Sequence, residues 1–151
     1  MDRSVTQEYI SFGEVKESLG QGELSPPGKF SNTTRILFVQ GGNLDESGNA
    51  ERWILGVDTG DIYELRVYDR SGWTIIPWDG IISAEEIDLE RVISPEALFN
   101  KNTIQILGSS PSAISAQRDI ELKAGTYKIT IVSGNTSRVL MYNATTGVTI
   151  E

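Results

Sequence analysis

The chain of 151 residues contains no cysteine and no histidine. Disulfide bonds, thiolate chemistry, cysteine- or histidine-based zinc sites and catalytic triads with a histidine base are therefore excluded. No Lys/Arg cluster is longer than two residues, and the formal net charge is -8. Because proteins that bind nucleic acid or anionic membranes need a cationic face, we expect neither as a partner.

Long apolar runs are also missing. No run approaches the roughly 20 residues that span a bilayer, so no transmembrane segment is expected. Residues 1–11 lack the apolar core of a signal peptide, so an exported protein would need a targeting segment outside this sequence. The length fits a single domain over residues 1–151, in which the glycines and prolines of residues 16–31 predict a mobile loop or arm.

What the sequence does contain is apolar and polar alternation between turn residues. Glu51–Pro77 predicts a three-stranded antiparallel meander, with turns at Asp58–Asp61 and Asp69–Gly72. Period-two alternation bounded by such turns is typical of a half-buried antiparallel sheet. Other segments with strand-like patterns are Glu8–Val15, Arg35–Val39, Thr103–Leu107, Ala113–Ala116, Arg118–Lys123, Thr126–Ser133, Arg138–Tyr142 and Val148–Glu151.

Helical signals are confined to residues 83–100. Ser83 could open a first helix with Glu86 completing a capping box, and Ser94-Pro95 predicts the start of a second helix that runs to Asn100. We therefore expect a mainly β fold, an antiparallel β-sandwich or partly open barrel of about nine or ten strands, with one or two short helices near residues 83–100.

The best candidate for a metal site is the polar segment Asn43–Glu51, which lies between two predicted strands. Oxygen side chains at its first, third and fifth positions, followed by Gly48, suit a loop that wraps a calcium ion. The twelfth position is Ile54, where a bidentate glutamate would usually close the shell, so a plain polar connection is the competing interpretation. The candidate ligands are Asn43, Asp45, Ser47, Asn49 and Glu51.

Trp78 is the candidate contact for a ligand or a partner. It follows Pro77 at the end of a predicted strand and precedes Asp79. An exposed tryptophan beside a carboxylate could stack on a sugar or anchor a protein, because it offers a large rigid surface. The alternative, which the usual burial of large aromatics favours, is that Trp78 caps the core.

The hairpin text Ile120–Ile131 resembles a hairpin found near the end of many extracellular β-sandwich modules, among them pre-peptidase C-terminal domains and some carbohydrate-binding domains. The resemblance implies an extracellular sandwich and carries over no functional residues.

We find no catalytic or cofactor motif, so the expected function is a non-catalytic extracytoplasmic module for binding, adhesion or a structural role, with an unknown protein or carbohydrate as partner. Two alternatives stay open. One is a cytoplasmic or phage-type structural protein that acts by oligomeric assembly. The other is a small hydrolase that uses carboxylates alone, drawing on pairs such as Glu85-Glu86 and Asp58 with Asp61.

Overall fold

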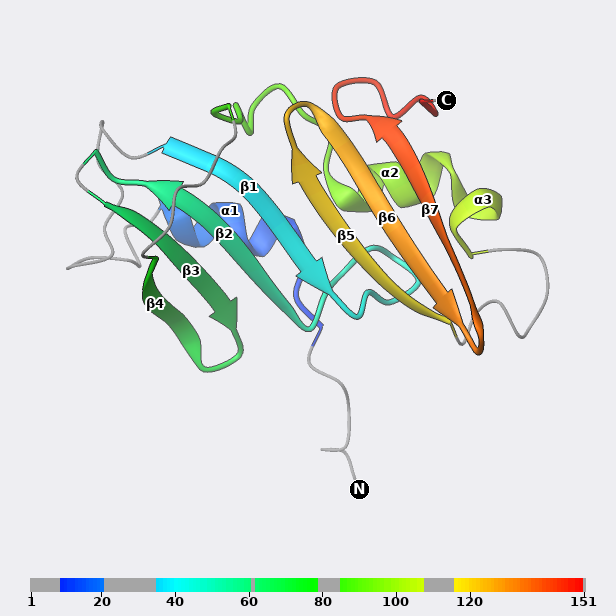
Figure 1. The fold of residues 1–151 in the computed structure, drawn as a ribbon, viewed down its shortest axis with the longest axis horizontal. Helices are drawn as coiled ribbons and strands as arrows, with labels where there is room; N and C mark the ends of the chain where they lie inside the picture. The colour runs from blue at the N-terminus through cyan, green and yellow to red at the C-terminus, as the bar shows by residue number, and fades with distance from the viewer. Residues whose placement is uncertain (1–8, 21–34, 61, 79–84, 108–115, 151) are drawn as a thin grey trace.

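A computed structural model of the chain describes residues 9–20, 35–60, 62–78, 85–107 and 116–150. This part is mainly β, with one antiparallel sheet of seven strands and three short helices (Figure 1). The strands are β1 (Arg35–Gly42), β2 (Arg52–Asp58), β3 (Tyr63–Asp69), β4 (Gly72–Trp78), β5 (Gln117–Lys123), β6 (Thr126–Ser133) and β7 (Thr136–Asn143). The helices are α1 (Phe12–Gly20), α2 (Pro95–Lys101) and α3 (Thr103–Leu107).

The sheet consists of two meanders that meet in its middle, in the order β4-β3-β2-β1-β5-β6-β7. The predicted meander forms β2, β3 and β4, and β5, β6 and β7 form the second through tight turns. The junction is short: β1 and β5 share three residue pairs, from Val39↔Leu122 to Gly41↔Ile120. A short junction lets the two halves diverge on either side of it.

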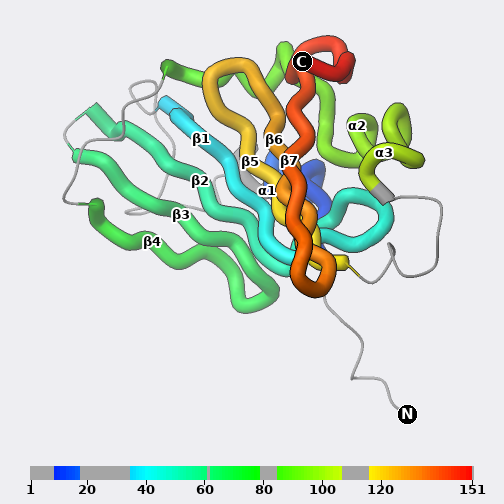
Figure 2. The backbone as a smooth tube through the Cα atoms, turned by 45° about the vertical axis from the view of Figure 1, so that its right-hand side comes forward, coloured from blue at the N-terminus to red at the C-terminus, as the bar shows by residue number. Residues whose placement is uncertain are grey.

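All three helices lie on the same face of the sheet (Figures 1 and 2). Phe12 of α1, Leu98 of α2 and Ile106 of α3 join one buried cluster with sheet residues such as Trp53 and Ile129. The Trp53 ring lies 5.1 Å from that of Phe12, and its indole nitrogen donates to the Ile10 carbonyl oxygen at 2.8 Å. No described helix covers the other face, so within the described part of the chain the sheet has one packed face and one uncovered face.

The predicted strand Glu8–Val15 is wrong. Ile10 makes only an isolated bridge with Ala50, and α1 begins at Phe12. The physical reason is a cap, because the Ser11 hydroxyl accepts a hydrogen bond from the Glu14 backbone N–H at 3.1 Å. Helix α1 also includes residues 16–20 of the predicted loop, while residues 21–31 lie outside the described part.

Thr103–Leu107, predicted as a strand, is helix α3. It continues from α2 because Asn102 donates its backbone N–H to Leu98, and the Thr103 hydroxyl donates to the Phe99 carbonyl oxygen at 3.0 Å. Ile106 is buried and Ile104 is 75% exposed, so the two isoleucines do not share the core as they would on one face of a strand.

Of the helical region predicted over residues 83–100, the part from Pro95 is confirmed, with Ser94 as the N-cap of α2. Residues 85–94 are not helical. They run across the packed side as an irregular segment, held by the Ile87 N–H on the Ile36 carbonyl and the Ile93 N–H on the Ala144 carbonyl. The predicted cap at Ser83 lies outside the described residues.

The sandwich or barrel is not confirmed, and the described strands number seven rather than nine or ten. Two predicted strands are helical, and Val148–Glu151 contributes only a bridge between Thr149 and Tyr142. Residues 113–115 lie outside the described part. In the described part, helices occupy the face of the sheet that a second sheet would cover in a sandwich. None of the described helices is long and apolar enough to cross a membrane.

Candidate functional site

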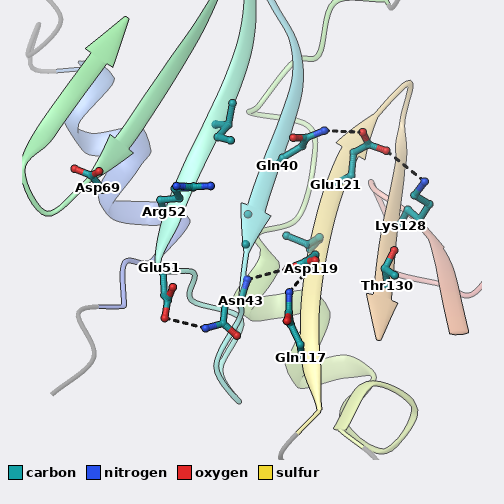
Figure 3. Close-up of a pocket in the computed structure, with 14 residues that line it drawn as sticks. Gln40, Asn43, Glu51, Arg52, Asp69, Gln117, Asp119, Glu121, Lys128 and Thr130 are labelled. Carbon is teal, nitrogen blue, oxygen red and sulfur yellow. Dashed lines mark hydrogen bonds and ion pairs between the residues drawn. The ribbon is translucent and has the colours of Figure 1, made fainter. Parts of the chain in front are cut away.

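The candidate site is a solvent-open depression of about 790 Å³ on the uncovered face of the sheet (Figure 3). It lies over the β1–β5 junction and is called the junction depression below. Most of the side chains that line it end in planar polar groups, namely amides, carboxylates and a guanidinium group. Gly42 is also a lining residue. They include Gln40, Asn43, Glu51, Arg52, Asp69, Gln117, Asp119, Glu121, Lys128 and Thr130.

Gly41 and Gly42 end strand β1 and lie in the lining of the depression. The predicted strand Arg35–Val39 is too short, because β1 continues to Gly42. A Cβ on Gly41 would lie 2.6 Å from the Trp53 ring, so the ring packs beneath β1 only because this residue has no side chain. Gly41 therefore lets a large core residue pack directly against the strand that carries the depression.

Asn43 links two carboxylates at one end of the depression. Its side-chain amide donates to Glu51 at 2.8 Å, and its backbone N–H donates to Asp119 at 2.9 Å. Asn43 adopts φ 53°, a left-handed conformation that asparagine tolerates better than most residues. Figure 3 shows Asn43 between the two acidic side chains.

A second hydrogen-bonded row crosses from β1 to β6. The Gln40 amide donates to Glu121 at 3.1 Å, and the Lys128 ammonium group lies 3.8 Å from the other oxygen of the same carboxylate (Figure 3). These contacts hold one carboxylate between an amide and a cation. The row therefore presents donors and acceptors in defined positions rather than as freely rotating side chains.

The β2 and β3 side of the depression carries Arg52 and Asp69. The pKa of Asp69 is lowered because its carboxylate accepts hydrogen bonds from the Ser71 hydroxyl and backbone N–H, with a smaller contribution from the Arg52 charge. The site thus combines fixed negative charge with a neighbouring guanidinium group.

The five predicted calcium ligands fall into two hydrogen-bonded groups. Asn43 and Glu51 bind each other in the junction depression. The Asp45 carboxylate accepts backbone N–H groups from Ser47 at 2.8 Å and Asn49 at 3.0 Å, closing its own loop. Among the described residues, no group of three or more acidic, histidine or cysteine side chains is disposed to hold a metal. Calcium binding stays a prediction that calorimetry would check.

Trp78 lies on the uncovered face and is 45% exposed, so the interpretation that it caps the core is wrong. It pairs with Tyr63 at the far end of β4 from the Asp69↔Gly72 pair, which places it away from the junction depression. Asp79 lies outside the described residues.

The carboxylates predicted for a hydrolase are not gathered in the junction depression. Asp58 binds Arg35 and the Gly60 backbone N–H, whereas Glu85 and Glu86 are exposed in the irregular segment. Asp61 lies outside the described residues. The lining residues that sequence reasoning missed include Gln117, Asp119 and Glu121 on β5. Their alternation with buried Arg118, Ile120 and Leu122 was the available signal.

No protein-family model and no curated protein matches the chain. Among solved structures, the fold is similar to that of a protein from Clostridium difficile 630 named “putative lipoprotein”. The TM-score is 0.59 at 8% sequence identity, and the alignment covers 94% of this chain and 91% of the other. At this identity the likeness establishes a shared fold, and no site residue is transferred.

Proposed function

We propose that the chain is a non-catalytic, extracytoplasmic binding module that holds a hydroxyl-rich ligand of the oligosaccharide class in the junction depression. The observation that carries this proposal is the hydrogen-bonded lining on an uncovered sheet face. Amide, carboxylate and guanidinium groups supply paired donors and acceptors, which suit neighbouring hydroxyl groups on a sugar. The open shape suits a ligand that remains partly in solvent.

Two further observations support the proposal. Glu51, Asp119 and Glu121 are each held by an amide, a backbone N–H or an ammonium group, an arrangement that favours fixed recognition over proton transfer. The name of the structurally similar protein, “putative lipoprotein”, is in keeping with a role outside the cytoplasm.

The ligand proposal is tested by NMR titration with a panel of soluble hexose and N-acetylhexosamine oligomers. We expect a binder to shift the backbone amides of residues 40–43 and 117–121, and Glu121→Ala to weaken binding at least tenfold. Lys123→Ala is the matched control, because Lys123 is exposed on the same strand outside the depression. No shift in these segments with any oligomer, or equal effects of the two variants, would contradict the proposal.

The location is tested separately by fractionating cells that express the full gene. We expect the protein in the membrane or extracellular fraction. Its recovery from the cytoplasm alone would contradict the extracytoplasmic location but would leave the ligand proposal unaffected.

A further inference from the structure

Strand β7 forms one edge of the sheet and pairs with β6 from Thr136↔Ser133 to Asn143↔Thr126. In an antiparallel ladder, alternate residues direct their backbone groups toward the neighbouring strand and the others direct them away. The Asn143 N–H donates to the Val148 carbonyl at 2.8 Å, and the Ile150 N–H donates to the Met141 carbonyl at 2.8 Å. The odd-numbered residues of β7 therefore face away from β6.

The C-terminal segment covers only part of this outer edge. Val148–Ile150 lies beside Met141–Asn143, with the bridge Tyr142↔Thr149 at its centre. The outward backbone groups of Ser137 and Val139 have no hydrogen-bond partner within the described part of the chain. Within the described residues, the outer edge beside Thr136–Leu140 is therefore free, and it is called the free stretch below.

This edge lacks the features that usually prevent strand addition. Natural edge strands carry prolines, bulges or several charges. Strand β7 has a regular register, no proline and a single charged residue, Arg138. At the opposite edge, β4 contains Pro77, which has no N–H to offer to another strand. The free stretch of β7 is thus the more competent of the two edges.

Exposed apolar side chains gather around the same edge. Of the nine exposed large hydrophobic residues of the described part, six lie on β7 or on elements in contact with it. Val139 is 52% exposed and Met141 41% exposed, and both extend from β7 on the uncovered face. The others are Ile104, Val132, Val148 and Ile150. Helix α3 joins this group because Gln105 accepts hydrogen bonds from Arg138 and Tyr142.

Two kinds of strand could pair with the free edge of β7: the same strand of a second copy, or an extended segment of another polypeptide. The C-terminal segment limits an added strand to the stretch beside Thr136–Leu140. If two copies of β7 paired antiparallel over this whole stretch, Arg138 would lie directly opposite its own symmetry mate. Like charges in directly opposed positions destabilise a strand pair, whereas opposite charges stabilise it. A second copy is therefore disfavoured, and an acidic residue is favoured opposite Arg138.

We propose that the free edge of β7 binds an extended segment of another polypeptide, which adds an eighth strand to the sheet. The segment carries a carboxylate opposite Arg138 and apolar side chains on either side of it. These apolar side chains point to the uncovered face, where they pack against Val139 and Val132. This site is separate from the junction depression, so its test and that of the proposed function fail independently.

The probe is the synthetic peptide acetyl-Thr-Val-Glu-Val-Thr-amide, titrated into the full chain and followed by NMR. We expect shifts of the Ser137 and Val139 amides with a dissociation constant on the order of 1 mM. A peptide with Lys in place of Glu should bind about fivefold more weakly, in keeping with the energies of cross-strand pairs. A peptide that is N-methylated at both valines should not bind, because it loses the donors that face β7.

Two protein variants complete the test. Arg138→Glu should reverse the preference between the Glu and Lys peptides, and Val139→Pro should abolish binding by removing an outward N–H. If Val139→Pro fails to fold, the N-methylated peptide still tests the backbone hydrogen bonds to β7 with the unaltered protein. Absence of shifts at 10 mM peptide, equal binding of the two peptides, or a concentration-dependent dimer that Val139→Pro abolishes would overturn the proposal.

Discussion

At the scale of single residues, Gly41 and Gly42 are neighbours with different constraints. An added Cβ on Gly41 would meet the Trp53 ring at 2.6 Å, whereas the nearest atom to a Cβ on Gly42 is an Asp119 oxygen at 4.0 Å. We expect Gly41→Ala to lower the free energy of unfolding by about 1–3 kcal/mol, because the buried ring must move.

Gly42→Ala is the matched control and should change stability by less than about 0.5 kcal/mol. Urea denaturation of both variants measures the difference. Equal stabilities would show that the Trp53 ring can move away at little cost.

Asp58, like Asp69, is a residue from which we expect a pH effect. The Gly60 backbone N–H and then the Arg35 guanidinium lower the pKa of this carboxyl group. The native state therefore keeps Asp58 ionised at a pH where the unfolded chain takes up a proton. Asp58 therefore stabilises the folded state fully when the pH is above the ordinary pKa of an aspartate. This stabilisation is lost as the pH falls through the lowered pKa of Asp58 in the folded state.

Asp58→Asn should accordingly reduce the drop in melting temperature between pH 5 and pH 2. Arg35→Gln provides the comparison, since it leaves the Gly60 hydrogen bond, the larger cause, in place. We expect this variant to retain most of the acid sensitivity. An unchanged drop in Asp58→Asn would refute the assignment.

At the scale of elements, α2 depends on its cap. The Ser94 hydroxyl accepts the Ala97 backbone N–H at 3.1 Å, and Pro95 occupies the first helical position. Ser94→Ala should lower the free energy of unfolding by about 1 kcal/mol, because the N–H loses its acceptor. Asn100→Ala, an exposed change in the same helix, should have a smaller effect. Thermal unfolding measures both, and equal losses would contradict a capping role.

The predictability of the helices differed for identifiable reasons. Ser94-Pro95 is a strong local signal, and α2 was predicted from it. Ser11 and Glu14 carry a similar capping signal, but the alternation around Ile10 and Phe12 favoured a strand. Thr103–Leu107 has the apolar alternation of a strand, and only its continuation from α2 makes it helical. Two local signals thus competed in Glu8–Val15, whereas contacts with residues outside Thr103–Leu107 decided the conformation of that segment.

At the scale of the whole molecule, a contact between two aromatic rings packs α1 on the sheet. Phe12 of α1 packs against Trp53 of β2, with ring centres 5.1 Å apart. Phe12→Ala should lower the free energy of unfolding by about 3–5 kcal/mol, because it leaves a cavity at the interface of the two layers.

Denaturation followed by tryptophan fluorescence measures this loss. Val148→Ala, at a side chain that is 61% exposed, is the control and should cost less than about 0.5 kcal/mol. A loss below 1 kcal/mol in Phe12→Ala would show that α1 contributes little to the stability of the sheet.

Most residues of the candidate site could not be predicted from the sequence. Asn43 and Glu51 were identified as calcium ligands, and the structure places them among the polar residues of the junction depression. Gln40, Arg52 and Lys128 belong to strands that the sequence does not show to be neighbours. Lys128 approaches Gln40 and Arg52 through the β1–β5 pairing, which links residues about 80 positions apart in the chain.

By itself, the sequence determined the antiparallel meander from Glu51 to Pro77, the second hairpin across Ala124-Gly125 and the absence of cysteine and histidine chemistry. These features follow from local alternation, turn residues and composition. Tertiary structure decided that the two meanders form one sheet, that helices rather than a second sheet cover its packed face, and that polar residues gather on the other. The reason is that strand order and layer packing depend on contacts between distant segments, which no local pattern records.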